Sequence, residues 1–255
     1  MAIQSINRAI DILSLFTVSR PQMGITEISE ALQLSKTTVH GIIRTLTHRG
    51  FLQQDRETKK YSLGLTIYEM GTRVSETIKI NQVSYGHATR LAQKTGQTIR
   101  IAVWDQDTII ITLNVTSDLE NPYMQPSGIR LPAYCTALGK AILSAMPQEH
   151  LDTYLKKNND YTLYTTHTIP SEDELIKELE IIRQRNYAED REESFPGIFC
   201  VATPIFDHLG TPFAAIAVSG DANFLQLETL PQIIEDMTRT AMEISRSFGY
   251  FHSLV

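Results

Sequence analysis

Residues 25–62 read ITEISEALQLSKTTVHGIIRTLTHRGFLQQDRETKKYS and predict a helix, a short turn, a second helix and a basic hairpin. Thr26 is expected to cap the first helix and Ser35 the second, because a side-chain hydroxyl accepts a hydrogen bond from a free N–H group. The inward positions of the first helix are Ile28, Ala31 and Leu32. This order of elements is typical of a winged helix-turn-helix.

The second helix has two chemically different faces. Apolar residues recur at helical spacing and are expected to face a core, namely Val39, Ile42, Ile43 and Leu46. The other face is small, hydrogen-bonding or cationic, and it consists of Ser35, Lys36, Thr37, Thr38, His40 and Arg44. Such a surface suits the major groove of DNA, where base edges offer hydrogen-bond partners. We therefore predict DNA binding, with Ser35 acting more as a cap than as a base reader, and with His40 either contacting a phosphate or having no role.

Cations around this helix are expected to contact phosphates, which gives affinity without sequence information; they are Arg56, Lys59 and Lys60 of the hairpin, and Arg8. The alternative is a helical hairpin on a small sheet whose cations are merely solvated. Residues 1–65 hold eight Lys and Arg against five Asp and Glu, a net +3, and the remaining 190 hold fifteen against twenty-four, a net −9. A chain that is acidic overall but basic in one segment favours a polyanionic partner for that segment.

Length and composition limit the class of protein. A chain of 255 residues suits one small and one medium domain. No apolar run approaches the ~20 residues that span a bilayer, and no signal-peptide pattern begins the chain, so no membrane partner is expected. Cys135 and Cys200 are the only cysteines, which is too few for a disulfide framework and indicates a reducing cytoplasm.

The remaining elements follow from periodicity. A helix over residues 5–16 completes a DNA-binding domain at 1–64, with Ser5 as its cap and with Ala9, Ile10, Ile12, Leu13 and Phe16 buried. A linker helix at 65–80 is expected to pack on a partner copy. Within 81–255, strand-like runs at 98–104, 108–115, 187–194, 198–207 and 213–220 lie among helices at 83–94, 136–146, 171–186 and 230–248, with an irregular stretch through Pro122 and Pro126. Thr136 and Ser171 are expected to cap the second and third of these helices. This predicts an α+β domain with an antiparallel sheet.

Two blocks of the larger domain carry a resemblance. RLPAYCTALGKAILSAMP (130–147) and NYAEDREESFPGIFCVATPIFDHLGTPFAAIAVSG (186–220) resemble the signature blocks of the effector-binding domain of the IclR family of bacterial transcription regulators. The resemblance covers essentially the whole chain. It implies a GAF-like effector-binding domain, small-molecule effectors that are often carboxylates or aromatic acids, and dimers or tetramers on palindromic operator DNA. Tyr134 and Cys135 stand where the family often has His or another small residue, so the resemblance does not identify the ligand.

The chemistry of the residues and the family resemblance together indicate a candidate effector site. The helix start at Thr136, Ala137, Leu138 and Gly139 offers N–H groups where the helix dipole favours an anion, and Cys135 precedes it. Asp190 is expected to accept a hydrogen bond from the ligand. The resemblance places Ile198, Cys200 and Ser219 on strands that face the same cavity. Each residue also has a simpler reading: Cys200 as a buried small hydrophobe, Asp190 on a solvated strand face, and Ser219 as part of a turn.

Other classes of function have weaker support. An enzyme would pair Cys135 or Cys200 with His208, or Asp190 with Glu192, but no nucleophile, phosphate-binding or metal motif surrounds them. A metal sensor would use Cys135, Asp190 and Cys200, a sufficient ligand set at undiagnostic spacing. A third alternative is an interaction module with an empty pocket. We predict a regulator without catalysis, cofactor or metal, in which an effector repacks the linker helix and resets the spacing of two recognition helices, ~34 Å or a multiple apart.

Overall fold

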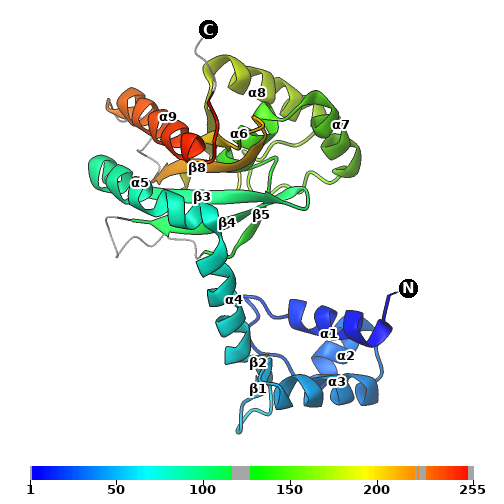
Figure 1. Cartoon of the computed structure of the whole chain (residues 1–255). Coiled ribbons are helices and arrows are strands. Elements are labelled where there is room, and N and C mark those ends of the chain that lie inside the picture. The colour runs from blue at the N-terminus through cyan, green and yellow to red at the C-terminus, as the bar shows by residue number, and fades with distance from the viewer. Residues whose placement is uncertain (1, 117–126, 222, 224–227, 252–255) are drawn as a thin grey trace. The chain divides into compact units, whose positions relative to one another are not determined.

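The structure, a computed structural model, describes residues 2–116, 127–221, 223 and 228–251. The chain divides into two compact units, Met1–Ile78 and Lys79–Val255, each with its own hydrophobic core (Figure 1). The predicted irregular stretch through Pro122 and Pro126 lies outside the described residues. Within the described part of the chain, no helix has the length and apolar character needed to cross a membrane.

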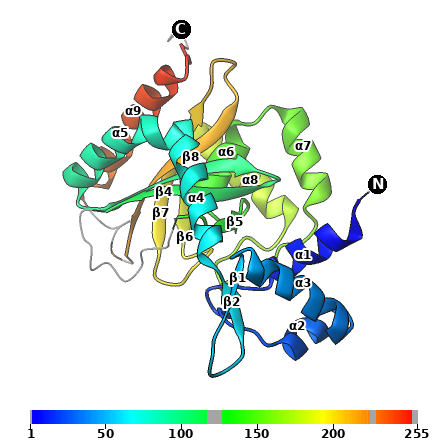
Figure 2. The same cartoon turned by 60° about the horizontal axis from the view of Figure 1, so that its bottom comes forward.

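The N-terminal unit contains four helices and a two-stranded hairpin: α1 (Gln4–Ser14), α2 (Ile25–Leu32), α3 (Lys36–His48), β1 (Leu52–Gln54), β2 (Tyr61–Leu63) and α4 (Leu65–Thr77). The strands β1 and β2 pair antiparallel and lie next to the end of α3 (Figure 2). Met23 bridges to Tyr61, which ties the hairpin to the segment before α2. The core joins α1, α2, α3 and the hairpin through Ile12, Phe16, Met23, Ile28, Val39, Ile43, Leu52 and Tyr61.

The start of α2 differs from the prediction. Gly24, not Thr26, occupies the N-cap position, and the Glu27 carboxylate accepts the Gly24 N–H at 2.7 Å. The helix ends at Leu32, and the C-cap residue Gln33 adopts a left-handed conformation. Ser35 then caps α3 as predicted, since its hydroxyl accepts the Thr38 N–H at 3.2 Å.

Some residues predicted as inward face solvent. On α1, which Ile3 rather than Ser5 caps, Ile10 is 54% exposed, and it lies in one stripe with exposed Ile3 and Ile6. On α2, Ala31 is exposed. These helices carry apolar residues on more than one side, and the short N-terminal core covers one side only. The exposed apolar residues of α4 are Leu65, Tyr68, Met70 and Val74.

The C-terminal unit consists of one sheet and five helices in its described part: α5 (Lys79–Thr95), β3 (Thr98–Asp105), β4 (Thr108–Val115), β5 (Arg130–Pro132), α6 (Ala137–Ala145), α7 (Gln148–Lys157), α8 (Glu172–Arg185), β6 (Ala188–Arg191), β7 (Phe199–Phe206), β8 (Pro212–Gly220) and α9 (Leu230–Ser247). The strand order is β5-β4-β3-β8-β7-β6, and every neighbouring pair is antiparallel. This confirms the predicted α+β fold.

Helices cover both faces of this sheet (Figure 1). On one face the sheet presents small residues beneath α6, namely Ala102, Ala188, Ala202, Ala215 and Ala217. On the other face, which α5 and α9 cover, the same strands present larger residues, such as Ile101, Ile216 and Val218. The alternation is that of a sheet buried on both sides. Because alanines have little volume, α6 lies close to the strands.

Several boundaries differ from the prediction. The linker helix ends at Thr77 rather than at residue 80, and the next helix begins at Lys79 rather than at residue 83. The strand expected over 187–194 is only Ala188–Arg191, because the chain turns after Arg191. Helix α7 and the short strand β5 were not predicted.

Candidate nucleic-acid interface and effector site

The start of α3 is fixed by the side chains of Ser35 and Thr38. Their hydroxyl oxygens lie 2.9 Å apart, and the Ser35 oxygen also accepts the Thr38 N–H. Thr38 is half-buried, whereas Lys36 and Thr37 are exposed. Of the predicted base-reading residues, Thr38 is therefore partly committed to the helix cap.

The exposed face of α3 lies opposite the buried Val39 and Ile43. The predicted residues Lys36, Thr37, His40 and Arg44 are all exposed, and α3 contains no acidic residue. Three further residues of α3, which were not predicted as part of this face, are exposed: Gly41, Thr45 and His48. Their helical spacing from Thr37 and Arg44 would have been sufficient to predict that they share this face. The residues of this face are small, hydrogen-bonding or cationic along its whole length.

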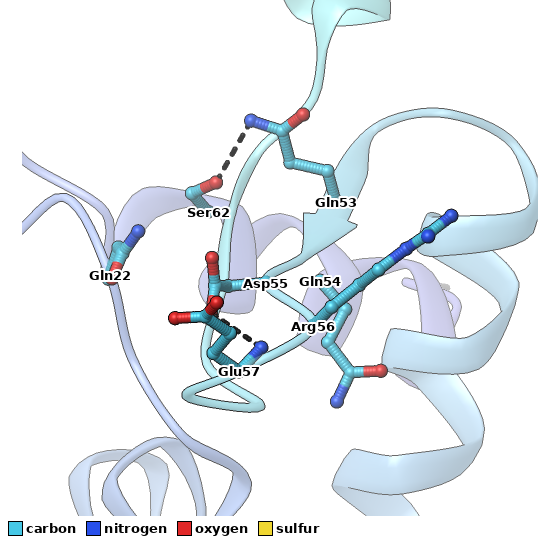
Figure 3. Close-up of a pocket in the computed structure, with 7 residues that line it drawn as sticks. All are labelled: Gln22, Gln53, Gln54, Asp55, Arg56, Glu57 and Ser62. Atoms are coloured by element: carbon cyan, nitrogen blue, oxygen red, sulfur yellow. Dashed lines mark hydrogen bonds between the residues drawn. The ribbon is translucent and has the colours of Figure 1, made fainter.

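The loop of the β1–β2 hairpin is ordered by Asp55. Its carboxylate accepts the N–H of Glu57 at 3.0 Å and the N–H of Thr58 at 2.7 Å. The hydrogen bonds from Thr58 hold the pKa of Asp55 below its usual value. Arg56 points away from the carboxylates of Asp55 and Glu57, on the rim of a hollow of about 440 Å³ (Figure 3). Its guanidinium therefore reaches outward from the loop.

The remaining predicted phosphate contacts differ in how free they are. Lys59 is exposed, in a left-handed conformation with φ +58°. Lys60 lies 3.4 Å from the Glu27 carboxylate, which also pairs with Arg20 at 3.3 Å. Arg8 is half-buried on α1. The Glu27 carboxylate already offsets the charge of Lys60. We therefore expect Lys60 to attract a phosphate less strongly than Arg56 and Lys59 do.

In the C-terminal unit, hydrogen bonds within the chain use part of the start of α6. The Thr136 hydroxyl caps the helix by accepting the Gly139 N–H at 3.1 Å, as the sequence predicts, and it donates to the Pro132 carbonyl at 3.1 Å. A Cβ on Gly139 would lie 2.3 Å from the Cα and carbonyl oxygen of Ala133. Gly139 thus allows close packing of the segment before α6, and its N–H is already bonded. Cys135, Ala137 and Leu138 are buried beside it.

Asp190 is buried rather than on a solvated face. Its two oxygens accept the Glu193 N–H at 2.7 Å and the Ser194 hydroxyl at 2.8 Å, so it shapes the turn after β6. Burial raises the pKa of Asp190, although the charge of Lys140 opposes the shift. Because both oxygens already accept hydrogen bonds within the chain, Asp190 has less remaining capacity to accept a hydrogen bond from a ligand.

A buried ion pair between Lys140 and Glu193 was not predicted. Lys140 on α6 is 1% exposed, and its Nζ lies 2.5 Å from Oε1 of Glu193. The other carboxylate oxygen, Oε2, has no hydrogen-bond partner among the described residues. Burial raises the pKa of Glu193 to about 7 despite the attraction of Lys140. Fifty-three residues separate the partners, so no local sequence pattern indicates the pair.

The two thiols lie on buried elements near these carboxyl groups. Cys200 pairs in register with Asp190 on one side and Ser219 on the other, and its Sγ lies 3.1 Å from the Ser219 hydroxyl. Ile198 is buried just before the same strand. Burial raises the pKa of Cys135 to about 12 and that of Cys200 to about 11. Both are therefore neutral thiols, unsuited to nucleophilic chemistry.

The geometry bears on the alternative functions. His208 is exposed in the turn after β7, whereas both thiols are buried. Among the described residues, no group of three His, Cys, Asp or Glu side chains is placed to hold a metal.

A groove of about 740 Å³ runs along α8 and β6, and its charged walls include Lys140 and Glu193.

A small unit with an exposed, acid-free recognition helix and a hairpin, in one chain with a larger α+β unit, defines a DNA-binding regulator with a separate sensing domain. Comparisons with known proteins agree. Residues 5–56 match the IclR helix-turn-helix domain, and residues 72–246 match the C-terminal domain of bacterial transcriptional regulator IclR. The chain belongs to the IclR family.

Individual relatives span nearly the whole chain. The HTH-type transcriptional regulator XynR of Escherichia coli is 32% identical over 248 residues, which cover 97% of this chain and 98% of XynR. The crystal structure of Thermotoga maritima IclR matches with a TM-score of 0.75 and 30% identity, over 98% of this chain and 100% of that one. An IclR homologue from Microbacterium hydrocarbonoxydans, complexed with 4-hydroxybenzoate, matches in fold with a TM-score of 0.78 at 18% identity, over 96% of this chain and 98% of that one.

Family membership establishes the class of function. The chain is a transcriptional regulator with a helix-turn-helix DNA-binding domain and a C-terminal effector-binding domain. Its relatives are regulators and not enzymes, which confirms the prediction that this chain is not a catalyst.

Proposed function

We propose that α3 enters the major groove of a double-stranded operator while the β1–β2 hairpin contacts the adjacent phosphate backbone of the DNA. The exposed, acid-free face of α3 carries this proposal. Thr37 and Arg44 read base edges, with Lys36, Thr38 and His40 contributing along the groove and Ser35 holding the helix start. Arg56 and Lys59 contact phosphates, while Lys60 and Arg8 play smaller parts. The proposed division is a DNA-binding domain over residues 1–64, a linker over 65–78 in place of the predicted 65–80, and an effector domain over 79–255 in place of 81–255.

Arg44→Ala and Arg56→Ala are expected to separate base reading from phosphate contact. Loss of a base contact by Arg44 should weaken operator binding by roughly 1–3 kcal/mol and leave random DNA nearly unaffected. Loss of Arg56 should weaken binding to both and lower the salt slope by about 1. Fluorescence anisotropy at several salt concentrations measures both quantities, on a duplex that the wild-type protein selects from a randomised pool. Equal losses on both DNAs for Arg44→Ala would refute the division of roles.

We propose further that the protein acts as a homodimer, or a tetramer built from dimers, in the cytoplasm where its DNA lies. The exposed apolar residues of α1 and α4 support self-association, because contiguous apolar surface, such as the stripe of Ile3, Ile6 and Ile10 on α1, commonly marks an interface. Two copies would present two α3 helices to successive major-groove segments. A palindromic operator matches such two-fold symmetry.

We propose that a small organic acid binds in the C-terminal unit and changes operator affinity. Support comes from the grouping of Cys200, Ser219 and Asp190 on one sheet face near the start of α6. The 4-hydroxybenzoate complex of a structural neighbour shows a carboxylate bound by a protein of this fold. The site would comprise Cys135, Thr136, Ala137, Leu138, Gly139, Asp190, Ile198, Cys200 and Ser219, and bound ligand would repack the linker helix.

An effector of this kind is expected to raise the midpoint of thermal unfolding and to change the operator dissociation constant by about 5-fold or more. The probes are 4-hydroxybenzoate, pyruvate and gluconate, added to the full chain. Ser219→Ala should weaken the response, whereas His208→Ala, on the exposed turn, should retain it. An acid that raises the midpoint without changing operator affinity would contradict the coupling.

A further inference from the structure

Gly41 occupies the middle of α3, where glycine has no structural purpose. Apart from its two chain neighbours and the adjacent backbone of α3, no heavy atom of the described residues lies within 4 Å of a Cβ built on Gly41, so the fold leaves room for a side chain. Its φ is not positive, so the backbone does not require glycine either. Glycine inside a helix is less favourable than alanine because it loses more backbone freedom on folding. The fold alone would therefore favour another residue here.

Gly41 lies in the centre of the exposed face of α3, where the absence of a side chain leaves space for a partner molecule. At 3.6 residues per turn, Thr37, Gly41, Arg44 and His48 fall within about 60° of one another around the helix axis. All four are exposed. Gly41 is thus a gap in the centre of the surface that we assign to DNA, flanked by longer side chains. Through this gap the helix backbone can come close to a base edge.

We propose that Gly41 is a specificity-determining residue, which lets α3 approach the base edges of the operator closely enough that any side chain at this position would collide with them. The proposal rests on the placement of α3 in the major groove. It assigns to DNA recognition a residue that contributes no hydrogen-bonding group of its own. The closest base pair is then selected by shape, since a neighbouring pair that projects further into the groove is excluded.

The test uses Gly41→Ala and Gly41→Leu in the full chain, because both residues are good helix formers. Both variants should keep or raise the unfolding midpoint of the N-terminal unit in calorimetry, Gly41→Ala by a few degrees. On a duplex that the wild-type protein selects from a randomised pool, Gly41→Ala should bind about 10-fold more weakly and Gly41→Leu about 100-fold, with a much smaller change on random DNA. Gly86→Leu is the matched control, an exposed glycine inside α5 of the other unit.

Each other outcome overturns the proposal. Wild-type operator affinity of Gly41→Leu would show that nothing approaches the gap. Equal losses on operator and random DNA would show contact with the backbone rather than with bases. Loss of the N-terminal unfolding transition would contradict the open space, and an equal loss in Gly86→Leu would show a non-local effect. Failure of the wild-type protein to select any duplex would instead refute DNA recognition by α3.

Discussion

Lys140→Ala is expected to lower the free energy of unfolding of the C-terminal unit by about 3–5 kcal/mol, because it leaves the buried Glu193 without its partner. Trp104, the only tryptophan of the chain, packs against Tyr154 in this unit, so its fluorescence during urea unfolding reports the loss. Lys177→Ala on α8 is the control. It removes an exposed ion pair with Glu174 and should leave the free energy of unfolding nearly unchanged.

The same variant should depend on pH in a defined direction. Burial already raises the pKa of Glu193 to about 7, and removal of Lys140 takes away an opposing influence. A carboxyl group with a raised pKa in the folded state costs stability increasingly as the pH rises above its unfolded value. The loss in Lys140→Ala should therefore be smaller at pH 5 than at pH 8. Lys140→Met combined with Glu193→Leu should recover most of it, and a double variant as unstable as Lys140→Ala would contradict the assignment to an unpaired charge.

Gly139→Ala is expected to destabilise the C-terminal unit by about 3 kcal/mol, near the upper end of the overpacking range. The new Cβ would lie 2.3 Å from backbone atoms of Ala133, and no change of rotamer can relieve a clash with backbone. Trp104 fluorescence during urea unfolding again measures the effect. Gly86→Ala, an exposed glycine inside α5 of the same unit, should instead be neutral or slightly stabilising. Wild-type stability of Gly139→Ala would show that Gly139 is not needed for packing.

Much of the fold could be predicted because its local signals are strong. The hydroxyls of Ser35, Thr136 and Ser171 cap α3, α6 and α8 as expected, and the strands from 98 to 115 and from 199 to 220 follow clear apolar patterns. Helix α7 also had a readable signal, since Leu151, Tyr154 and Leu155 recur at helical spacing between Glu149 and Lys157. Strand β5 had none, because its three residues are too few to show a period.

The candidate sites were less predictable because they depend on which groups meet across the fold. The exposed face of α3 follows from helical periodicity, so its predicted residues lie together. The pairing of Lys60 with Glu27 and of Lys140 with Glu193 joins residues far apart in sequence. The N-cap of α2 is Gly24 rather than Thr26, and the Glu27 carboxylate accepts the Gly24 N–H. Ile10 was predicted as buried because its type is apolar, but it lies on the side of α1 that the N-terminal core does not cover.

Methylation interference on a selected duplex tests the placement of α3 most directly. Dimethyl sulfate methylates guanine N7, which lies in the major groove, and adenine N3, which lies in the minor groove. If two copies each insert α3, methylated guanines should block binding in two major-groove segments about one helical turn, ~10 bp, apart. Interference confined to adenine N3, or binding unaffected by guanine methylation, would contradict recognition of the operator by α3.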